Sequence, residues 1–416
     1  MDRNDFYAQR SRFFLALSPA GRGGLYLCAL IGVATFITGM MLGQTQRTWG
    51  SFLFNLFFFF CIALGGIALG PMQDVIGAMW GRPIRRLHEA FGAFVPVALC
   101  CFAAYLACIK LNVWEAKSIY KWIANPEMLH HFPGKSTWLQ ENFMIIRNIA
   151  ALVLLGLLTR WQMRQGVKRD LALVAGDKKL AHALGEKVRQ SLRHWSAPVM
   201  VAYSVLFSVL VFDLLMSLAP TWLSTLWGGW CFSIMMQTLF ALLLVMMFFF
   251  KNSPIGEFYG QKQFHDVGKL LHGFTVFYAY LTFAHILTYW YTNIPEETSF
   301  FLDRLQEPWL YLVIVSPFLT FVFPFFMLIP KASKWLAPVT IPIALVSLAG
   351  QWLTFLLVVM PELTDGKGLI FPWIEVGIFM GFLGCFLACF FRFASTVPML
   401  PIADPLLKEA LEGGGH

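Results

Sequence analysis

Residues 51–70 read SFLFNLFFFFCIALGGIALG and contain no charged side chain. A helix of about 20 predominantly apolar residues is long enough to cross the hydrocarbon core of a bilayer. Further stretches of similar length and character occur along the chain, and together they predict ten transmembrane helices. The predicted spans are 23–43, 51–70, 88–111, 142–160, 196–220, 228–250, 266–291, 309–329, 336–360 and 371–393.

The composition of the whole chain agrees with this interpretation. Of 416 residues, 58% are hydrophobic and 13% are charged, whereas soluble domains carry about 25% charged residues. This excludes a soluble enzyme, a disordered tail and a nucleic-acid-binding protein, and it predicts an all-α integral membrane protein. The 8 cysteines form no C-x-x-C or C-x-x-C-H motif, so we expect no metal site and no covalently attached haem.

The basic residues indicate the orientation. About three quarters of the 31 basic residues lie at the N-terminus, in the even-numbered loops and at the C-terminus, with the adjoining helix ends. Because cytoplasmic loops are enriched in Lys and Arg, we expect both termini to lie in the cytoplasm. An even number of spans satisfies this arrangement. The chain is therefore predicted to be a multi-pass membrane protein with both termini on the cytoplasmic side.

The longest predicted cytoplasmic loop, 160–195, is strongly basic. Within it an apolar residue recurs every four positions, at Leu180, Leu184, Val188 and Leu192. This spacing predicts a basic helix with one apolar stripe, which suits contact with the lipids of an anionic leaflet. The alternative is an ordinary amphipathic connector packed on the helix bundle.

Three short matches recur in the same order and predict an internal repeat. They pair 87–88 with 271–272, 139–141 with 305–307, and 195–199 with 335–339. The repeat divides spans 2–5 and 6–9 into two four-helix units that point the same way across the membrane. The predicted division is a cytoplasmic N-terminus with span 1 (1–50), a first bundle (51–225), a second bundle (226–362), and span 10 with the C-terminus (363–416).

Polar side chains within or beside the spans are functional candidates, because each is costly in hydrocarbon. Counting along the helices places them at two levels. The outer level holds Arg147, Asp213, His285, Gln351 and Glu375, and the inner level holds Asp74, His88, Glu89 and His272. These residues predict either a proton path or buried ion pairs. Arg147 and Asp213 lie on consecutive antiparallel spans at a similar depth, so a direct ion pair between them is expected. The residues predict no catalytic group.

Two longer strings resemble a known family. The first is Phe212–Leu218, FDLLMSL, followed by Pro220, Trp222, Ser224, Thr225 and Gly228. The second begins Asp266–Leu271, DVGKLL, and ends Asn293–Thr298, NIPEET. Both are similar to the ActF subunit of bacterial alternative complex III, a quinol:electron-acceptor oxidoreductase. The similarity extends over nearly the whole chain and places it in the superfamily of NrfD and the polysulfide reductase membrane subunit.

The resemblance implies a non-catalytic membrane subunit that scaffolds electron-transfer partners and conducts protons coupled to quinol oxidation. It implies ten spans in two four-helix bundles, a location in the bacterial inner membrane, and no redox centre of the chain's own. The implied partners are an ActC-like sister subunit, an iron–sulfur subunit, multihaem cytochrome c subunits and small membrane subunits. Haem c and iron–sulfur clusters would belong to those partners, while quinol or quinone is a possible ligand of this chain. Asp213 is the strongest functional position by motif.

Two alternatives remain open from the sequence. The first is a quinone-binding membrane anchor subunit of a related NrfD-type oxidoreductase. The second is a secondary transporter, since parallel repeats and polar sites within the membrane occur there too. A transporter predicts broken helices around a central binding site.

Overall fold

A computed structural model describes residues 10–129, 133–364 and 372–412 of the chain. Within them all regular secondary structure is helical, and ten segments are long and apolar enough to cross a membrane. The prediction of an all-α fold with ten apolar spans is confirmed. The ten segments are Pro19–Met41 (α2), Thr45–Ile76 (α3), Arg85–Leu111 (α4, η2 and α5), Glu141–Val174 (α8), Lys178–Leu218 (α9 and η5), Trp227–Phe249 (α10), Gln261–Thr292 (α11), Trp309–Leu328 (α13, η8 and α14), Ala337–Leu363 (α16) and Trp373–Thr396 (α17).

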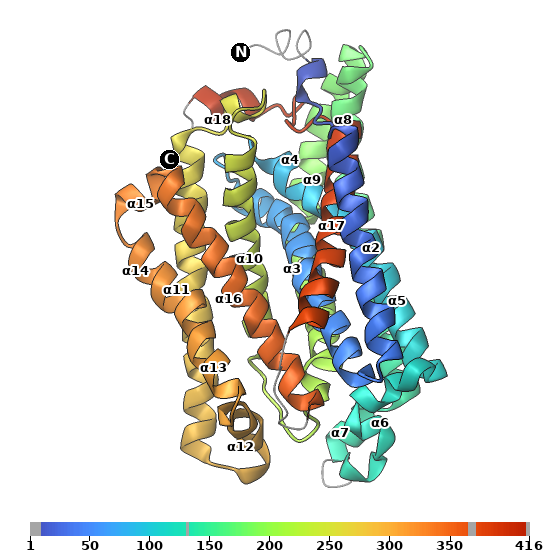
Figure 1. Cartoon of the computed structure of the whole chain (residues 1–416). Helices are drawn as coiled ribbons and strands as arrows, with labels where there is room; N and C mark the ends of the chain where they lie inside the picture. The colour runs from blue at the N-terminus through green and yellow to red at the C-terminus, as the bar shows by residue number, and fades with distance from the viewer. Residues whose placement is uncertain (1–9, 130–132, 365–371, 413–416) are drawn as a thin grey trace.

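The long helices run between two ends of the molecule (Figure 1). The termini end carries the short helices η1 (Arg10–Phe13), α15 (Lys331–Trp335) and α18 (Leu407–Glu412). The loop end carries α6 (Lys121–Ala124), α7 (Pro133–Trp138) and α12 (Pro295–Leu302), which lie in the two long connections of that end. The described N-terminal and C-terminal segments therefore lie at the same end.

Helix α3, which contains the Phe-rich stretch 51–70, is the central helix. Its most apolar window is 94% buried inside the protein. A helix that is apolar all round needs neighbours on every side. It contacts α4, α5 and α9 on one side and α10, α16 and α17 on the other. The stretch therefore forms the core between two groups of helices.

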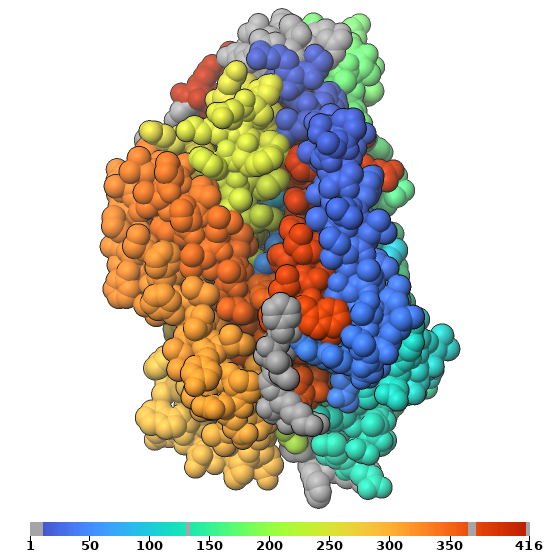
Figure 2. All heavy atoms as spheres, viewed as in Figure 1, coloured from blue at the N-terminus to red at the C-terminus, as the bar shows by residue number. Residues whose placement is uncertain are grey.

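The remaining contacts assign the spans to groups. Helices α3, α4–α5, α8 and α9 contact one another, and a second set of contacts links α10, α11, α13–α14 and α16. Helices α2 and α17 pack along each other and against α3 of the first group, and Figure 2 shows α2 in blue next to the red-orange α17. This packing is very close, because a Cβ atom added at Gly32 would lie 2.3 Å from the Cα atom of Gly381.

The segment 160–195 is not a loop. Helix α8 continues to Val174 and α9 begins at Lys178, so the connection is a tight turn in which Gly176 has φ 92°. The Asp177 side chain caps α9 by accepting a hydrogen bond from the Leu180 amide at 2.8 Å. The basic stripe is thus the first half of a span-length helix packed along α8, and Leu180 is 47% exposed. This geometry fits a packed connector rather than a helix lying flat on the membrane.

Several helices are longer than their apolar stretches. Helix α11 begins at Gln261 instead of 266, and α3 ends at Ile76 instead of 70. Hydropathy reports where hydrocarbon ends, whereas a helix ends where its backbone hydrogen bonds or its cap end. The eighth span is the opposite case: it is interrupted by the π-helical segment η8 (Phe318–Val322), which follows Pro317.

Candidate functional site

The predicted polar residues lie in three places: the loop end, the middle of the second helix group, and the termini end. At the loop end, Arg147 of α8 and Asp213 of α9 form a two-point ion pair. Arg147 Nε lies 2.8 Å from Oδ2 and Nη2 lies 2.8 Å from Oδ1 of the buried Asp213 carboxylate. Asn148 Nδ2 and Trp138 Nε1 also donate to this carboxylate, at 2.7 and 2.9 Å. Every lone-pair direction of Asp213 is thus engaged.

Glu375 of α17 is the second acid near the loop end. Its carboxylate accepts two hydrogen bonds from Arg47 of α3, at 2.7 and 2.9 Å, and it is fully buried. Ser51 Oγ donates to the same carboxylate at 3.3 Å. Bidentate arginine–carboxylate pairs are among the strongest charge-assisted hydrogen bonds. The pair therefore joins α17 to the central helix.

Gln351 lies in the middle of α16 rather than at the outer level. Its Nε2 donates to Gln237 Oε1 at 2.6 Å, and Gln237 lies midway along α10. Gln237 in turn donates to the Thr320 carbonyl at 2.7 Å and to Ser347 Oγ at 2.9 Å. Thr320 belongs to the π-helical segment, so these uncharged groups hold the interrupted span. The predicted span 336–360 nearly coincides with α16 (Ala337–Leu363), and Gln351 lies near the middle of that helix.

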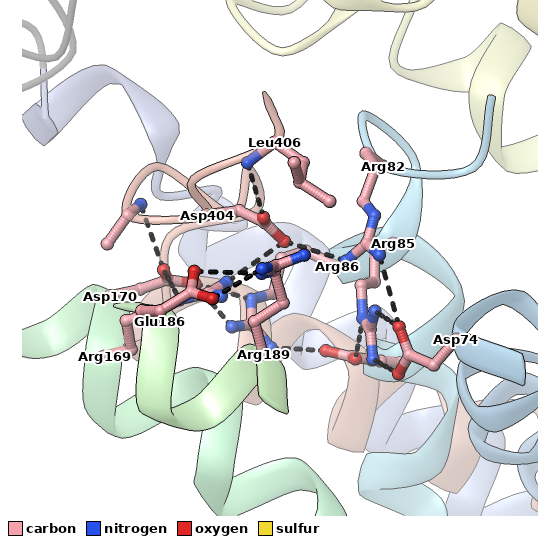
Figure 3. A network of polar contacts seen from close by, with 12 residues as sticks. Asp74, Arg82, Arg85, Arg86, Arg169, Asp170, Glu186, Arg189, Asp404 and Leu406 are labelled. Carbon is pink, nitrogen blue, oxygen red and sulfur yellow. Dashed lines mark hydrogen bonds and ion pairs between the residues drawn. The ribbon is translucent and has the colours of Figure 1, made fainter. Parts of the chain in front are cut away.

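At the termini end, Asp74 and Glu89 belong to a buried group of eight charged residues, which we call the ionic cluster. Figure 3 labels all of its members except Glu89. Arg85 of α4 donates to both oxygens of Asp74 at 2.7 Å and to Glu89 Oε1 at 2.9 Å. Arg86 donates to Glu89 and to Asp170. The members are Asp74, Arg82, Arg85, Arg86, Glu89, Arg169, Asp170 and Asp404.

The C-terminal segment closes the ionic cluster. Asp404 accepts from Arg82 at 3.2 Å and from Arg169 at 3.5 Å. Burial disfavours the charged form of Asp404, but Arg169 and Arg82 outweigh it and hold the pKa of that carboxyl well below its usual range. Four arginines and four acids cancel in charge. Such a buried network favours one arrangement of its parts, here of α3, α4, α8 and the segment around Asp404.

The two inner histidines are separate from each other. His88 is buried, and its Nδ1 lies 2.7 Å from the Gly66 carbonyl oxygen of α3, to which it donates. His272 of α11 stacks on Phe325 of α14, with ring centroids 5.4 Å apart. Each histidine therefore packs within its own helix group. Among the described residues no three His, Cys, Asp or Glu side chains gather as a metal site would require.

His285 of α11 lines a cavity of about 430 Å³ at the loop end of the second helix group. Small-molecule sites enclose roughly 300–1,000 Å³. Aromatic rings form most of the wall. Trp222 stacks on Phe300 with ring centroids 4.0 Å apart, and Trp230 stacks on Tyr278 at 5.9 Å. Offset or parallel rings of this kind fit a flat aromatic ligand better than a hydrated ion.

A few polar atoms converge on this aromatic wall. His285 Nδ1 donates to the Leu281 carbonyl oxygen at 2.8 Å, which leaves Nε2 as a buried acceptor without a partner among the described residues. The hydroxyls of Ser316 and Thr354 lie 3.0 Å apart at the same cavity. An unpaired buried acceptor is costly unless a ligand or water satisfies it. The cavity thus offers a hydrogen-bond acceptor inside an apolar site.

The cavity has an exposed rim between α11 and the α12–α13 region. The rim residues Ile286, Trp290 and Leu302 are 50%, 77% and 55% exposed and are all apolar or aromatic. Ile286 and Trp290 belong to the span-length helix α11, and the exposed apolar side of a helix that crosses a membrane faces lipid. A ligand with an apolar tail could therefore enter sideways from the bilayer.

Sequence reasoning missed several of these residues. Arg47, Gln237 and the arginines of the ionic cluster were not singled out, although Arg85 and Glu89 have the i, i+4 spacing of a helical ion pair. Arg304 was also missed; it donates to Glu362 at 3.0 Å and lies 3.4 Å over the Phe300 ring at the cavity. No periodicity marks Arg304, because it lies in a connection between spans. Trp222 was noted only as part of a motif.

Comparison with models of known protein families and with curated protein sequences finds no match for the chain. The cavity around His285 is therefore the functional candidate on its geometry, and the charged pairs at both ends are its structural surroundings.

Proposed function

We propose that this chain is an integral membrane subunit of a quinol:electron-acceptor oxidoreductase complex and that the His285 cavity holds the ring of a quinol or quinone. The observation that carries the proposal is the unpaired His285 Nε2 inside an aromatic cavity with an apolar rim. A quinol has a flat ring, two hydroxyl groups and an apolar tail. The ring matches the stacked aromatic walls, one hydroxyl can donate to Nε2, and the tail can leave through the rim into lipid.

The orientation supports the same proposal. If both termini lie in the cytoplasm, as the basic residues indicate, the cavity lies near the outer face of the bacterial inner membrane. The resemblance implies partners that carry iron–sulfur clusters and haem c, together with an ActC-like sister subunit and small membrane subunits. Oxidation of a quinol releases two electrons and two protons. The electrons would pass to those partner centres, while this chain binds and orients the ring.

The charged residues favour a structural role over a proton path in this chain. Asp213, Glu375, Asp74 and Glu89 are all held by arginines. Each of these carboxylates compensates the charge of the arginine that it contacts, and an arginine left buried without such a partner is costly. The proposed function is thus ligand binding and scaffolding.

The experiment is a binding titration that uses the cavity's own tryptophans. The chain is purified in mild detergent with its associated subunits, and quenching of tryptophan fluorescence by a short-tailed naphthoquinone is followed. Val313 lines the cavity, so Val313→Trp should fill it and weaken binding at least about tenfold. Val315, on the same helix, is 41% exposed and does not line the cavity, so Val315→Trp is the matched control. Equal binding by both variants would refute the proposal.

A secondary transporter is the second candidate, and one observation favours it. The eighth span is broken by a π-helical segment whose Thr320 carbonyl bonds to Gln237 in the middle of the bundle. Broken helices beside central polar residues are typical of transporters. Gln237 also bonds to Gln351 and to Ser347, and this leaves Gln351 Oε1 as a buried acceptor without a partner among the described residues. Uptake of a polar solute by proteoliposomes of the chain alone, abolished by Gln237→Leu and insensitive to Val313→Trp, would favour the transporter.

A further inference from the structure

Another cavity, of about 300 Å³, lies at the termini end between the start of α2 and the end of α17. It is distinct from the His285 cavity, which is at the loop end. Its polar side contains Arg22 and Arg392, and its apolar side contains Leu25 and Phe391. One cavity therefore combines two cationic side chains with apolar walls.

The backbone around this cavity is held in place. Leu15 donates its amide to the Ala394 carbonyl oxygen at 2.9 Å, and Met399 donates to the Phe13 carbonyl oxygen at 2.8 Å. The Ser18 side chain caps α2 by accepting from the Gly21 amide at 3.1 Å. The segment before α2 thus forms a fixed wall against the last turns of α17.

Arg22 and Arg392 are exposed side chains at this cavity, whereas the arginines of the ionic cluster are buried. The four arginines of the ionic cluster are all paired with acids. Arg22 donates its Nε to the Leu17 carbonyl oxygen at 3.2 Å, which orients the guanidinium. Across residues 10–129, 133–364 and 372–412, neither Arg22 nor Arg392 forms an ion pair with an acid. Two cationic groups therefore share one cavity without a neutralising partner.

The surface below the cavity is apolar. Helix α2 is only 17% buried over its most apolar window, and Leu30 and Val33 are 64% and 57% exposed. Figure 2 shows α2 forming the outer surface next to α17. Tyr26, at the cavity itself, is 62% exposed. Tyrosine at this level is typical of a membrane–water interface.

We propose that this cavity binds the phosphate headgroup of an anionic phospholipid, with the acyl chains lying along the exposed face of α2. Guanidinium groups bind phosphate oxygens through parallel N–H donors, and the cytoplasmic leaflet supplies anionic lipids. A free phosphate ion would satisfy the arginines but not the apolar wall and the α2 face. Both ligands carry a phosphate group that the arginines can bind. The apolar surface that continues from the cavity along α2 favours the lipid over the free ion.

The test measures lipid binding to the full chain by native mass spectrometry, with phosphatidylglycerol, phosphatidylcholine and inorganic phosphate as separate probes. The variant is Arg22→Gln/Arg392→Gln. The matched control is Arg160→Gln/Arg164→Gln, which removes the same charge from exposed positions of α8 that do not line the cavity. We expect the variant to bind phosphatidylglycerol about thirtyfold more weakly and the control to bind it as the wild type does.

Three results would overturn the proposal. The variant and the control could lose phosphatidylglycerol affinity equally, or the wild type could bind phosphatidylcholine as tightly as phosphatidylglycerol. The third is that inorganic phosphate displaces the bound lipid. If the glutamine variant does not fold, Arg22→Lys/Arg392→Lys takes its place. Lysine keeps the charge but lacks the planar guanidinium group. We therefore expect the lysine variant to bind phosphatidylglycerol more weakly than the wild type and still to prefer it over phosphatidylcholine. Unchanged affinity would contradict a role for the guanidinium geometry.

Discussion

Arg147 and Asp213 meet through two parallel hydrogen bonds of 2.8 Å between neighbouring antiparallel helices, and the carboxylate is fully buried. The Arg147 guanidinium also lies 3.7 Å over the Trp138 ring. The indole of Trp138 donates to Asp213, so one short helix of the loop end covers the pair. The pair therefore fixes α8, α9 and α7 together.

Breaking this pair from one side should cost more than removing both partners. Arg147→Met or Asp213→Leu alone leaves a buried charge unmatched, and such losses amount to about 3–5 kcal/mol. The double variant should be less destabilised than the sum of the single variants, because no charge remains. Thermal unfolding in detergent checks the cycle. Glu141→Gln is the control. The Glu141 carboxylate is 3.0 Å from Lys117, whose side chain is 32% exposed, so this change should cost less than about 1 kcal/mol.

Because every lone-pair direction of the Asp213 carboxylate is occupied by a hydrogen bond, we predict no proton transfer through Asp213. Its carboxylate accepts from Arg147, Asn148 and Trp138, so a proton would have to displace a charge-assisted bond. In the assembled complex, Asp213→Asn should leave the number of protons moved per electron unchanged in the fraction that folds. The ratio is measured with a pH indicator during quinol oxidation by proteoliposomes. A lower ratio with intact quinol oxidation would restore Asp213 to a proton path.

The sequence was sufficient for the features that depend on long apolar runs or on local spacing. The Phe-rich run 51–70 predicts a membrane span, and it forms part of the central helix α3. Arg147 and Asp213 lie at equal depth on consecutive spans, and they meet. Both inferences need only helix geometry and the thickness of a bilayer.

Features that depend on packing between distant segments were not predictable in this way. The partner of Glu375 is Arg47, which lies 328 positions away. The His285 cavity combines residues from α10, α11, α12 and α16 with Trp222 from a loop, and no periodicity links them. Gln351 was placed at the outer level, whereas it lies near the middle of α16, where it bonds to Gln237 of α10.

The contact between α2 and α17 should tolerate no side chain at its closest point. A Cβ atom at Gly32 would lie 2.3 Å from the backbone of Gly381, so Gly32→Ala must push the two helices apart. Overpacking of this kind costs about 1–3 kcal/mol. Gly24, on the same helix, has no atom within 4 Å of an added Cβ, so Gly24→Ala is the control and should be neutral or slightly stabilising. Thermal unfolding of both variants checks the difference.

Lys135 should make stability rise at alkaline pH. Its ammonium donates to the carbonyl oxygens of Pro220 and Trp222 at 2.7 and 2.8 Å. Burial lowers the pKa of Lys135 to about 8, against the opposing effect of Glu297. The pKa of lysine in an unfolded chain is about 10.4. Between the folded and the unfolded pKa, the unfolded chain therefore binds more protons than the folded chain, and the free energy of unfolding increases with pH.

Lys135→Met should remove this alkaline increase, because methionine has no titrating group. The unfolding temperature of wild type and variant is compared across about pH 7 to 10. Below the folded pKa the contribution of Lys135 to the pH dependence should vanish, so the two curves should run parallel there. Curves that also stay parallel above pH 8 would contradict the prediction.

Asp404 should anchor the C-terminal segment to the helix bundle. It is buried and forms ion pairs with Arg82 and Arg169. Its Oδ1 also accepts a hydrogen bond from the Leu406 amide at 3.0 Å. Asp404→Asn keeps the size of the side chain but leaves two buried arginines with less compensating charge, which should cost about 3 kcal/mol at neutral pH. Glu409→Gln removes the same charge from an exposed position of α18 and should have little effect.

The pH dependence separates this electrostatic role from simple packing. Since the folded pKa of Asp404 is depressed, its contribution is fully present above the ordinary aspartate value of about 3.9 and is lost as the pH falls through the folded value. The gap in unfolding temperature between wild type and Asp404→Asn should therefore be constant near neutral pH and shrink in acid. A gap that does not change with pH would mean that the asparagine disturbs packing and that the arginines do not depend on the Asp404 charge.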